Sequence, residues 1–146
     1  MDVLKDFLTK QGYTRVKLKL TKTNHFEIKA TINDVKGLFI LDTGASNSCI
    51  GFESVDTFNL DVQDSDVKAA GAGAINMQTQ ISKKNRVAIG KWKQKKTTLV
   101  LFNLVHVNTA LTNHHSNPVD GIIGADILKK TKAIIDYDKK YLYLKL

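Results

Sequence analysis

The 146-residue chain has little cysteine, little proline and no long apolar run. Its single cysteine, Cys49, excludes an internal disulfide, so the fold depends on its hydrophobic core. No apolar stretch approaches the roughly 20 residues that cross a bilayer, and we expect no membrane association. One proline and the lack of low-complexity segments argue against a disordered chain. We therefore expect a single folded domain over residues 1–146.

The N-terminal sequence and the net charge limit the expected cellular location and the expected binding partners. The first seven residues show no basic segment followed by an apolar one, so we expect no signal peptide and a cytoplasmic location. The formal net charge of +8 favours acidic partners or nucleic acid. However, the lysines are scattered, and the dense run over 91–96 is typical of a solvated hairpin turn. No nucleic-acid motif accompanies the charge, so we expect no nucleic-acid partner.

The hydrophobic pattern is helical at the start and near the end, and strand-like between. Residues 1–13 predict a helix-like extension that begins at Asp2 and ends at Gly12. Apolar residues then alternate with polar ones, as in strands with one buried face. The residues 33–37 predict a turn, 113–118 a loop and 125–130 a short helix. The predicted strands cover residues 15–20, 26–32, 38–41, 75–81, 86–89, 97–101, 133–137 and 141–146. The fold class is mostly β, with one or two short helices.

One apolar strand ends in an acidic residue. The run Phe39-Ile40-Leu41 leads directly into Asp42, followed by Thr43, Gly44 and Ala45. Because burying an isolated carboxylate is costly, an Asp in this position needs hydrogen-bond donors or solvent at a cleft. Gly44 permits a sharp turn whose backbone amides can face the carboxylate. The segment thus predicts a strand that presents a carboxylate.

A second carboxylate is needed for hydrolysis. Two carboxylates held about 3 Å apart cannot both ionise, so they share a proton and act together as acid and base. The chain contains only one Asp-Thr-Gly triplet, and neither the segment at Asp64 nor that at Asp120 repeats it. If the chemistry needs a pair, the second Asp42 must come from another copy across a two-fold axis.

Three ordered segments resemble the retropepsin-like aspartic peptidases. The apolar-apolar-Asp-Thr-Gly-Ala motif at Asp42 occurs once, as in the short chains of that family. The segment 119–128 is similar to the family's apolar-apolar-Gly strand and following helix, and the glycine-alanine tract 70–74 stands where its flap would lie. The closing hairpin is similar to that of cellular and bacterial members, and Ala125-Asp126 replaces the basic residue of the viral ones. The resemblance covers residues 14–146.

This resemblance implies a retropepsin-like acid-protease barrel and an aspartic endopeptidase. Asp42 of each subunit of a homodimer would activate water, while Thr43, Gly44 and Ala45 would form the active-site loop. Gly71, Ala72 and Gly73 would form the flap over an extended protein or peptide substrate. No metal or organic cofactor is implied.

Several alternatives stay open. Asp42 could cap a turn, and the same fold could bind extended peptides without cleaving them. Cys49 is interpreted as a buried structural thiol, since no neighbouring histidine in sequence suggests a nucleophile. His106, His114 and His115 lack the usual spacing of metal ligands. Asp120 and Asp126 are assigned structural roles in a turn and at a helix start.

Overall fold

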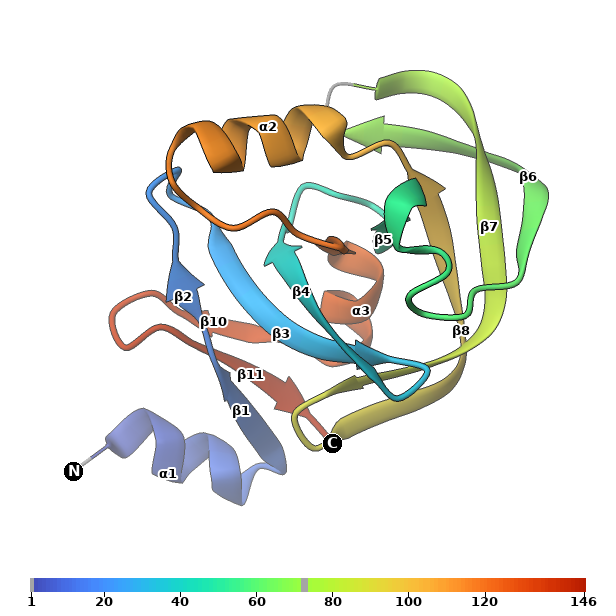
Figure 1. The fold of residues 1–146 in the computed structure, drawn as a ribbon. Helices are drawn as coiled ribbons and strands as arrows, with labels where there is room; N and C mark the ends of the chain where they lie inside the picture. The colour runs from blue at the N-terminus through green and yellow to red at the C-terminus, as the bar shows by residue number, and fades with distance from the viewer. Residues whose placement is uncertain (1, 72–73) are drawn as a thin grey trace.

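The computed structural model describes residues 2–71 and 74–146, and its centre is a closed six-stranded barrel (Figure 1). Strands pair around the ring in the order β3, β4, β9, β5, β8 and β7, and β7 pairs again with β3. Because the ring is closed, each of these six strands pairs with a neighbour on both sides. The strands are β3 Phe26–Ile32, β4 Val35–Leu41, β5 Cys49–Gly51, β7 Ala74–Ile89, β8 Trp92–Phe102 and β9 Gly121–Ile123.

Two further strands extend this sheet. The short β2 (Lys19–Leu20) pairs with β3, and β6 (Val62–Gly71) pairs with β7 to form a long hairpin. A single turn of 3₁₀ helix, η1 (Phe52–Ser54), follows β5. The helices are α1 Val3–Lys10, α2 Val105–Asn113 and α3 Ala125–Lys130. None of the helices in the described residues is long and apolar enough to cross a membrane.

Strand β4 lies between β3 and β9 and has apolar residues on both faces, as predicted. Phe39 and Leu41 belong to the larger core cluster, whereas Ile40 belongs to a second cluster. The turn before β4 is tighter than predicted: only Asn33 and Asp34 have positive φ angles, of 51° and 69°. Such a two-residue turn matches the twist of antiparallel strands. The strand therefore begins at Val35, and not after Gly37.

A separate three-stranded sheet joins the two ends of the chain. β11 (Tyr141–Lys145) pairs with both β1 (Tyr13–Lys17) and β10 (Ile134–Asp136), all antiparallel. Leu142 and Leu144 of β11 are fully buried in the larger core cluster. This sheet therefore packs against the barrel, and the closing hairpin occurs as predicted.

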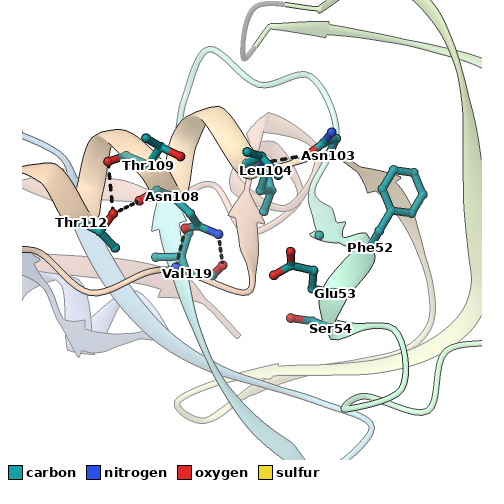
Figure 2. A pocket seen from close by; sticks show the side chains of 11 residues that line it. Phe52, Glu53, Ser54, Asn103, Leu104, Asn108, Thr109, Thr112 and Val119 are labelled. Atoms are coloured by element: carbon teal, nitrogen blue, oxygen red, sulfur yellow. Dashed lines mark hydrogen bonds between the residues drawn. The ribbon is translucent and has the colours of Figure 1, made fainter.

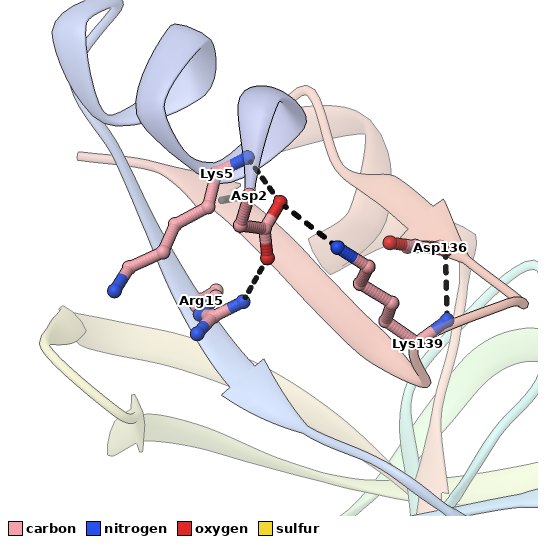
Figure 3. A network of polar contacts seen from close by, with 5 residues as sticks. All are labelled: Asp2, Lys5, Arg15, Asp136 and Lys139. Carbon is pink, nitrogen blue, oxygen red and sulfur yellow. Dashed lines mark hydrogen bonds and ion pairs between the residues drawn. The ribbon is translucent and has the colours of Figure 1, made fainter.

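Helix α1 is attached to this sheet by a polar network around Asp2 (Figure 3). The Asp2 carboxylate accepts a hydrogen bond from the Lys5 amide at 3.0 Å, as a helix cap. It also pairs with the Arg15 guanidinium at 3.0 Å and the Lys139 ammonium at 3.6 Å. First the Lys5 amide, and then these cations, lower the pKa of Asp2 from its ordinary 3.8. The predicted helix is confirmed, and Asp2 connects it to β1 and to the β10–β11 turn.

Several features differ from the sequence prediction. The strand expected over residues 15–20 is divided between β1, which pairs with β11, and β2, which pairs with β3. Strands β5 and β6 were not predicted. The turn expected over 91–96 is limited to residues 90 and 91, and β8 begins at Trp92, whose side chain is buried.

Residues 74–89 form one continuous strand, β7, where two shorter strands were expected. Helix α2 was not predicted at all, so the described residues contain three α-helices rather than one or two. α2 begins at Val105, whose amide donates to the Asn103 side chain at 2.9 Å. In Figure 1, α2 lies across one end of the barrel.

Candidate active site

Asp42 lies directly after the last residue of β4 and is partly exposed. Its amide donates to the Ile123 carbonyl of the parallel strand β9 at 3.0 Å, which continues the sheet for one more residue. Its Oδ1 accepts a hydrogen bond from the Gly44 amide at 2.9 Å, as the turn chemistry predicted. The carboxylate is thus fixed by one backbone donor while the remaining oxygen stays available.

The loop after Asp42 is held by Ser48, a residue that no motif or spacing in the sequence singled out. Ser48 is 1% exposed, and its amide and hydroxyl both donate to Asp126 Oδ1, at 2.9 and 2.8 Å. The same hydroxyl accepts a hydrogen bond from the Gly124 amide at 2.9 Å. The Ala45 carbonyl accepts from the Ala125 amide at 2.7 Å. The start of α3 therefore anchors both ends of the active-site loop.

Gly124 is required by the closeness of these two segments. A Cβ atom placed on it would lie 2.6 Å from the Ala45 carbonyl oxygen, which real Cβ atoms do not tolerate. The pattern Gly-Ile-Ile-Gly at 121–124 thus allows α3 to approach the active-site loop through backbone contacts.

A cavity of about 310 Å³ adjoins Asp42. Its floor and walls are mostly apolar, and two histidines and a threonine add polar groups. This combination is typical of sites that take a side chain of a ligand while a few polar groups orient it. Besides Asp42, the lining residues are Thr23, His25, Ile40, His106, Val107, Ala110, Leu111 and Ile122.

Helix α2 supplies four residues of this lining and is hydrogen-bonded to the segment that leads into β9. Asn108 donates to the Val119 carbonyl at 3.1 Å and accepts from the Val119 amide at 2.7 Å (Figure 2). These bonds border a second cavity of about 460 Å³ between α2 and η1, whose lining does not include Asp42. Asn108 therefore positions a wall of the Asp42 cavity without contacting that cavity itself.

The other predicted loop residues lie beside Asp42. Ala45 is buried, whereas Thr43 and Gly44 are exposed. Among the residues whose side chains the structure describes, 2–64 and 80–146, the Thr43 hydroxyl has no hydrogen-bond partner. Of the predicted flap residues, Gly71 ends β6 opposite Ala74 of β7, and Ala72 and Gly73 lie outside the described residues. The β6–β7 hairpin and α2 lie at the same end of the molecule in Figure 1.

The other acidic residues and the thiol have internal roles. Asp120 accepts hydrogen bonds from the Leu38 amide at 3.0 Å and the Ser54 hydroxyl at 2.9 Å. With Asp126 bound to Ser48, both residues have the structural roles that were predicted, although the partners of Asp126 lie in the active-site loop rather than in its own helix. Cys49 is 7% exposed, and burial raises the pKa of its thiol to about 12. A neutral buried thiol is a poor nucleophile.

A family model described as aspartyl protease matches residues 28–127, which include Asp42, all of the barrel strands except the first two residues of β3, and the first half of α3. The chain belongs to this aspartyl protease family. No curated protein sequence matches it. Among solved structures, it is similar to a retropepsin-like aspartic protease from Rickettsia conorii, with a TM-score of 0.61 and 23% identity over 91% of this chain and 89% of that one.

A viral structure has the same fold. The protease of EIAV, crystallised with the inhibitor HBY-793, aligns with a TM-score of 0.53 and 19% identity over 75% of this chain and 90% of that one. At these identities the likeness shows the fold alone, and it confirms the predicted retropepsin-like barrel. The chain thus belongs to the aspartyl protease family and has the retropepsin-like fold.

Proposed function

We propose that this aspartyl protease is an endopeptidase whose active site needs Asp42 from each of two identical subunits. The observation that carries the proposal is the position of Asp42: a single, partly exposed carboxylate at the end of a core strand, beside an apolar cavity. The nearby Asp120 and Asp126 are engaged by internal donors, so neither is free to complete a pair within the chain. A second copy supplies the missing carboxylate.

The chemistry follows from a shared proton. With the two Asp42 carboxylates close together, one is ionised and one protonated. The ionised group takes a proton from a bound water, whose oxygen attacks the peptide carbonyl carbon, while the protonated group gives its proton to the carbonyl oxygen. The resulting tetrahedral intermediate collapses when the carboxyl that took the water proton gives it to the amide nitrogen, which leaves as an amine. One hydroxyl of the intermediate returns its proton to the other carboxylate, so a carbonyl forms and the pair again holds one proton. No metal is needed in this cycle, because the carboxylates supply both acid and base.

The remaining loop residues have positioning roles in this proposal. Gly44 holds one oxygen of Asp42 and so fixes the direction of the other. Thr43 is exposed, and its hydroxyl has no internal partner in the described part of the chain, which favours a partner in the second subunit. The β6–β7 hairpin, with Gly71 near its tip, would cover an extended peptide. Ala72 and Gly73 complete the proposed flap by sequence.

The competing function is a module that binds extended peptides without cleaving them. It would use the same apolar cavity and the same hairpin, and it would not need the ionisable group of Asp42. Asp42→Asn separates the two functions, because the amide keeps the shape of the side chain but cannot share a proton.

The experiment is cleavage of a denatured protein mixture over a range of pH, with sedimentation of each variant. The proposal expects products from the wild type and loss of cleavage by several orders of magnitude in a dimeric Asp42→Asn protein. Cleavage that persists in the variant would identify a different catalytic residue. A folded wild-type dimer that binds peptides and cuts none would favour the binding module.

A further inference from the structure

A groove lined by lysines runs over the outer face of β3 and β4, outside the Asp42 cavity. It consists of two adjoining depressions, of about 760 and 500 Å³, which share Lys29 and Leu38 in their linings. We propose that this groove binds an acidic stretch of the polypeptide substrate, several residues away from the bond that is cleaved. The inference rests on the proposed peptidase function and adds the substrate class to it.

The lining of the groove is strongly basic. Six lysines from distant parts of the sequence contribute, against two acidic residues, Glu27 and Asp120. Asp120 is already occupied by donors from Leu38 and Ser54, and Glu27 is 8% exposed. The ion pairs among the described residues use Arg15, Arg86 and Lys139, and none of the groove lysines. The six are Lys17, Lys19, Lys29, Lys36, Lys93 and Lys140.

The groove continues from the Asp42 cavity along two paired strands. In the β3–β4 pair, Glu27 lies opposite Ile40, Lys29 opposite Leu38 and Thr31 opposite Lys36. Residues opposite one another in an antiparallel pair have their side chains on the same face of the sheet, and so do residues two positions apart in one strand. Ile40 lines the Asp42 cavity, whereas Leu38, two positions away, lines the groove. The two sites are therefore neighbours on one continuous face, about 7 Å apart along the strand.

The other strand gives the same result. His25 lines the Asp42 cavity and Glu27, two positions later, lines the groove. An extended peptide advances by about 3.3 Å per residue, the same step as β4. Leu38 and Lys36 are four and six positions from Asp42, so the acidic residues of the substrate are expected about four to six positions from the cleaved bond. Because a two-fold dimer has two such grooves, they can lie on either side of that bond.

A polypeptide fits the lining better than a nucleic acid does. Proteins that bind single strands combine basic grooves with aromatic side chains on which bases stack. The linings of both depressions contain no aromatic residue. They do contain backbone-lining glycines and the apolar side chains of Leu18, Leu20 and Leu38, which suit the aliphatic parts of Glu and Asp residues. The chain's net charge of +8 adds long-range attraction for the same partner.

The test uses a peptide that the wild-type dimer is found to cleave, synthesised in two forms. One form carries Glu at the fourth to sixth positions from the cleaved bond, and the other carries Gln. The proteins are wild type, the double variant Lys29→Glu/Lys36→Glu, and the matched control Lys10→Glu/Lys83→Glu, which changes the net charge equally at exposed lysines outside the groove. A Lys29→Gln/Lys36→Gln variant, which removes the two positive charges without adding negative ones, checks that the loss of preference for the Glu peptide increases with the charge removed.

In wild type we expect a KM about tenfold lower for the Glu peptide than for the Gln peptide at low salt, with similar kcat. This preference for the Glu peptide should shrink with added salt and be smaller in Lys29→Gln/Lys36→Gln. It should vanish in Lys29→Glu/Lys36→Glu and persist in the control Lys10→Glu/Lys83→Glu. Equal KM values for the two peptides in wild type, or equal loss of preference in the groove and control variants, would overturn the proposal.

Failure of the peptidase function gives a different signature. If no peptide is cleaved, no cleaved bond defines the Glu peptide, so a labelled oligo-glutamate peptide takes its place. Fluorescence anisotropy of this Glu peptide with the wild-type protein then decides the matter. Binding that is weakened in Lys29→Glu/Lys36→Glu but not in the control would support the groove even without cleavage. No binding, or tighter lysine-dependent binding of a short single-stranded oligonucleotide than of the Glu peptide, would overturn it.

Discussion

Asp126 accepts two hydrogen bonds from Ser48, one from its backbone amide at 2.9 Å and one from its hydroxyl at 2.8 Å. The two residues are 78 positions apart, yet they join the active-site loop to the first turn of α3. Because Ser48 is buried, its hydroxyl cannot turn to solvent if the carboxylate is removed. Asp126 thus holds in place the loop that follows Asp42.

Removing that carboxylate should destabilise the protein and disturb the loop. Asp126→Ala leaves the buried Ser48 amide and hydroxyl without their acceptor, and we expect a loss of about 2 to 3 kcal/mol in the free energy of unfolding. Urea unfolding measures it, with peptide cleavage as a second readout. The control is Asp138→Ala, an exposed residue of the β10–β11 turn, where about 0.5 kcal/mol or less is expected. Equal stability of the two variants would contradict this role.

Asn108 should affect substrate affinity from outside the site. Its two hydrogen bonds to Val119 hold α2, whose residues 106, 107, 110 and 111 line the Asp42 cavity. Asn108→Ala should cost about 1 to 3 kcal/mol and raise KM more than it lowers kcat. Thr109→Ala, on the exposed side of the same helix, is the matched control and should change neither. A fall in kcat at unchanged KM would contradict a role in wall placement.

Much of the site could be predicted from sequence because it depends on local pattern. The apolar run 38–41, the acidic residue after it and the glycines at 44 and 124 each require particular residue types in a fixed order. The strand and helix that the family resemblance implied over 119–128 are present as β9 and α3, and β9 pairs with β4 in parallel, with Ile122 beside Ile40.

The missed features depend on tertiary contacts. Helix α2 contains the β-branched Val105, Val107 and Thr109, which are weak helix formers, and it is secured through Asn108 and Val119. The Ser48–Asp126 contact joins segments that no spacing relates. The groove lysines are scattered along the chain, and only strand pairing brings them to one face.

Cys49 should be unreactive in the folded protein. Burial raises the pKa of its thiol from 9.0 to about 12, so the neutral form persists at pH 8. We expect alkylation by iodoacetamide to be slow without denaturant and fast in urea. The stabilisation linked to this thiol is complete below pH 9.0 and is lost as pH rises toward about 12, since the unfolded chain ionises first. Rapid alkylation of the native protein, with parallel loss of cleavage, would contradict the structural role.

Helix α1 should detach from the three-stranded sheet in acid. The pKa of Asp2 is lowered chiefly by the Lys5 amide, so its contribution is present above its ordinary pKa of 3.8 and is lost as pH falls through the lower folded value. The protection of the Lys5 and Leu8 amides, relative to their intrinsic exchange rates at each pH, should therefore fall at low pH, and in Asp2→Asn it should be low already at neutral pH. Asp6→Asn, on the same helix, is the control. Protection that is equal in wild type and Asp2→Asn would show that α1 does not need this network.

The requirement for two Asp42 carboxylates is tested most directly by mixing wild type with Asp42→Asn in varying proportions. The chains are unfolded and refolded together so that subunits assort at random, and peptide cleavage is measured at constant total protein. If each active site needs one Asp42 from either subunit, the rate falls as the square of the wild-type fraction. A rate that falls in direct proportion to that fraction would mean that each chain carries a complete active site, and would contradict the proposed dimeric mechanism.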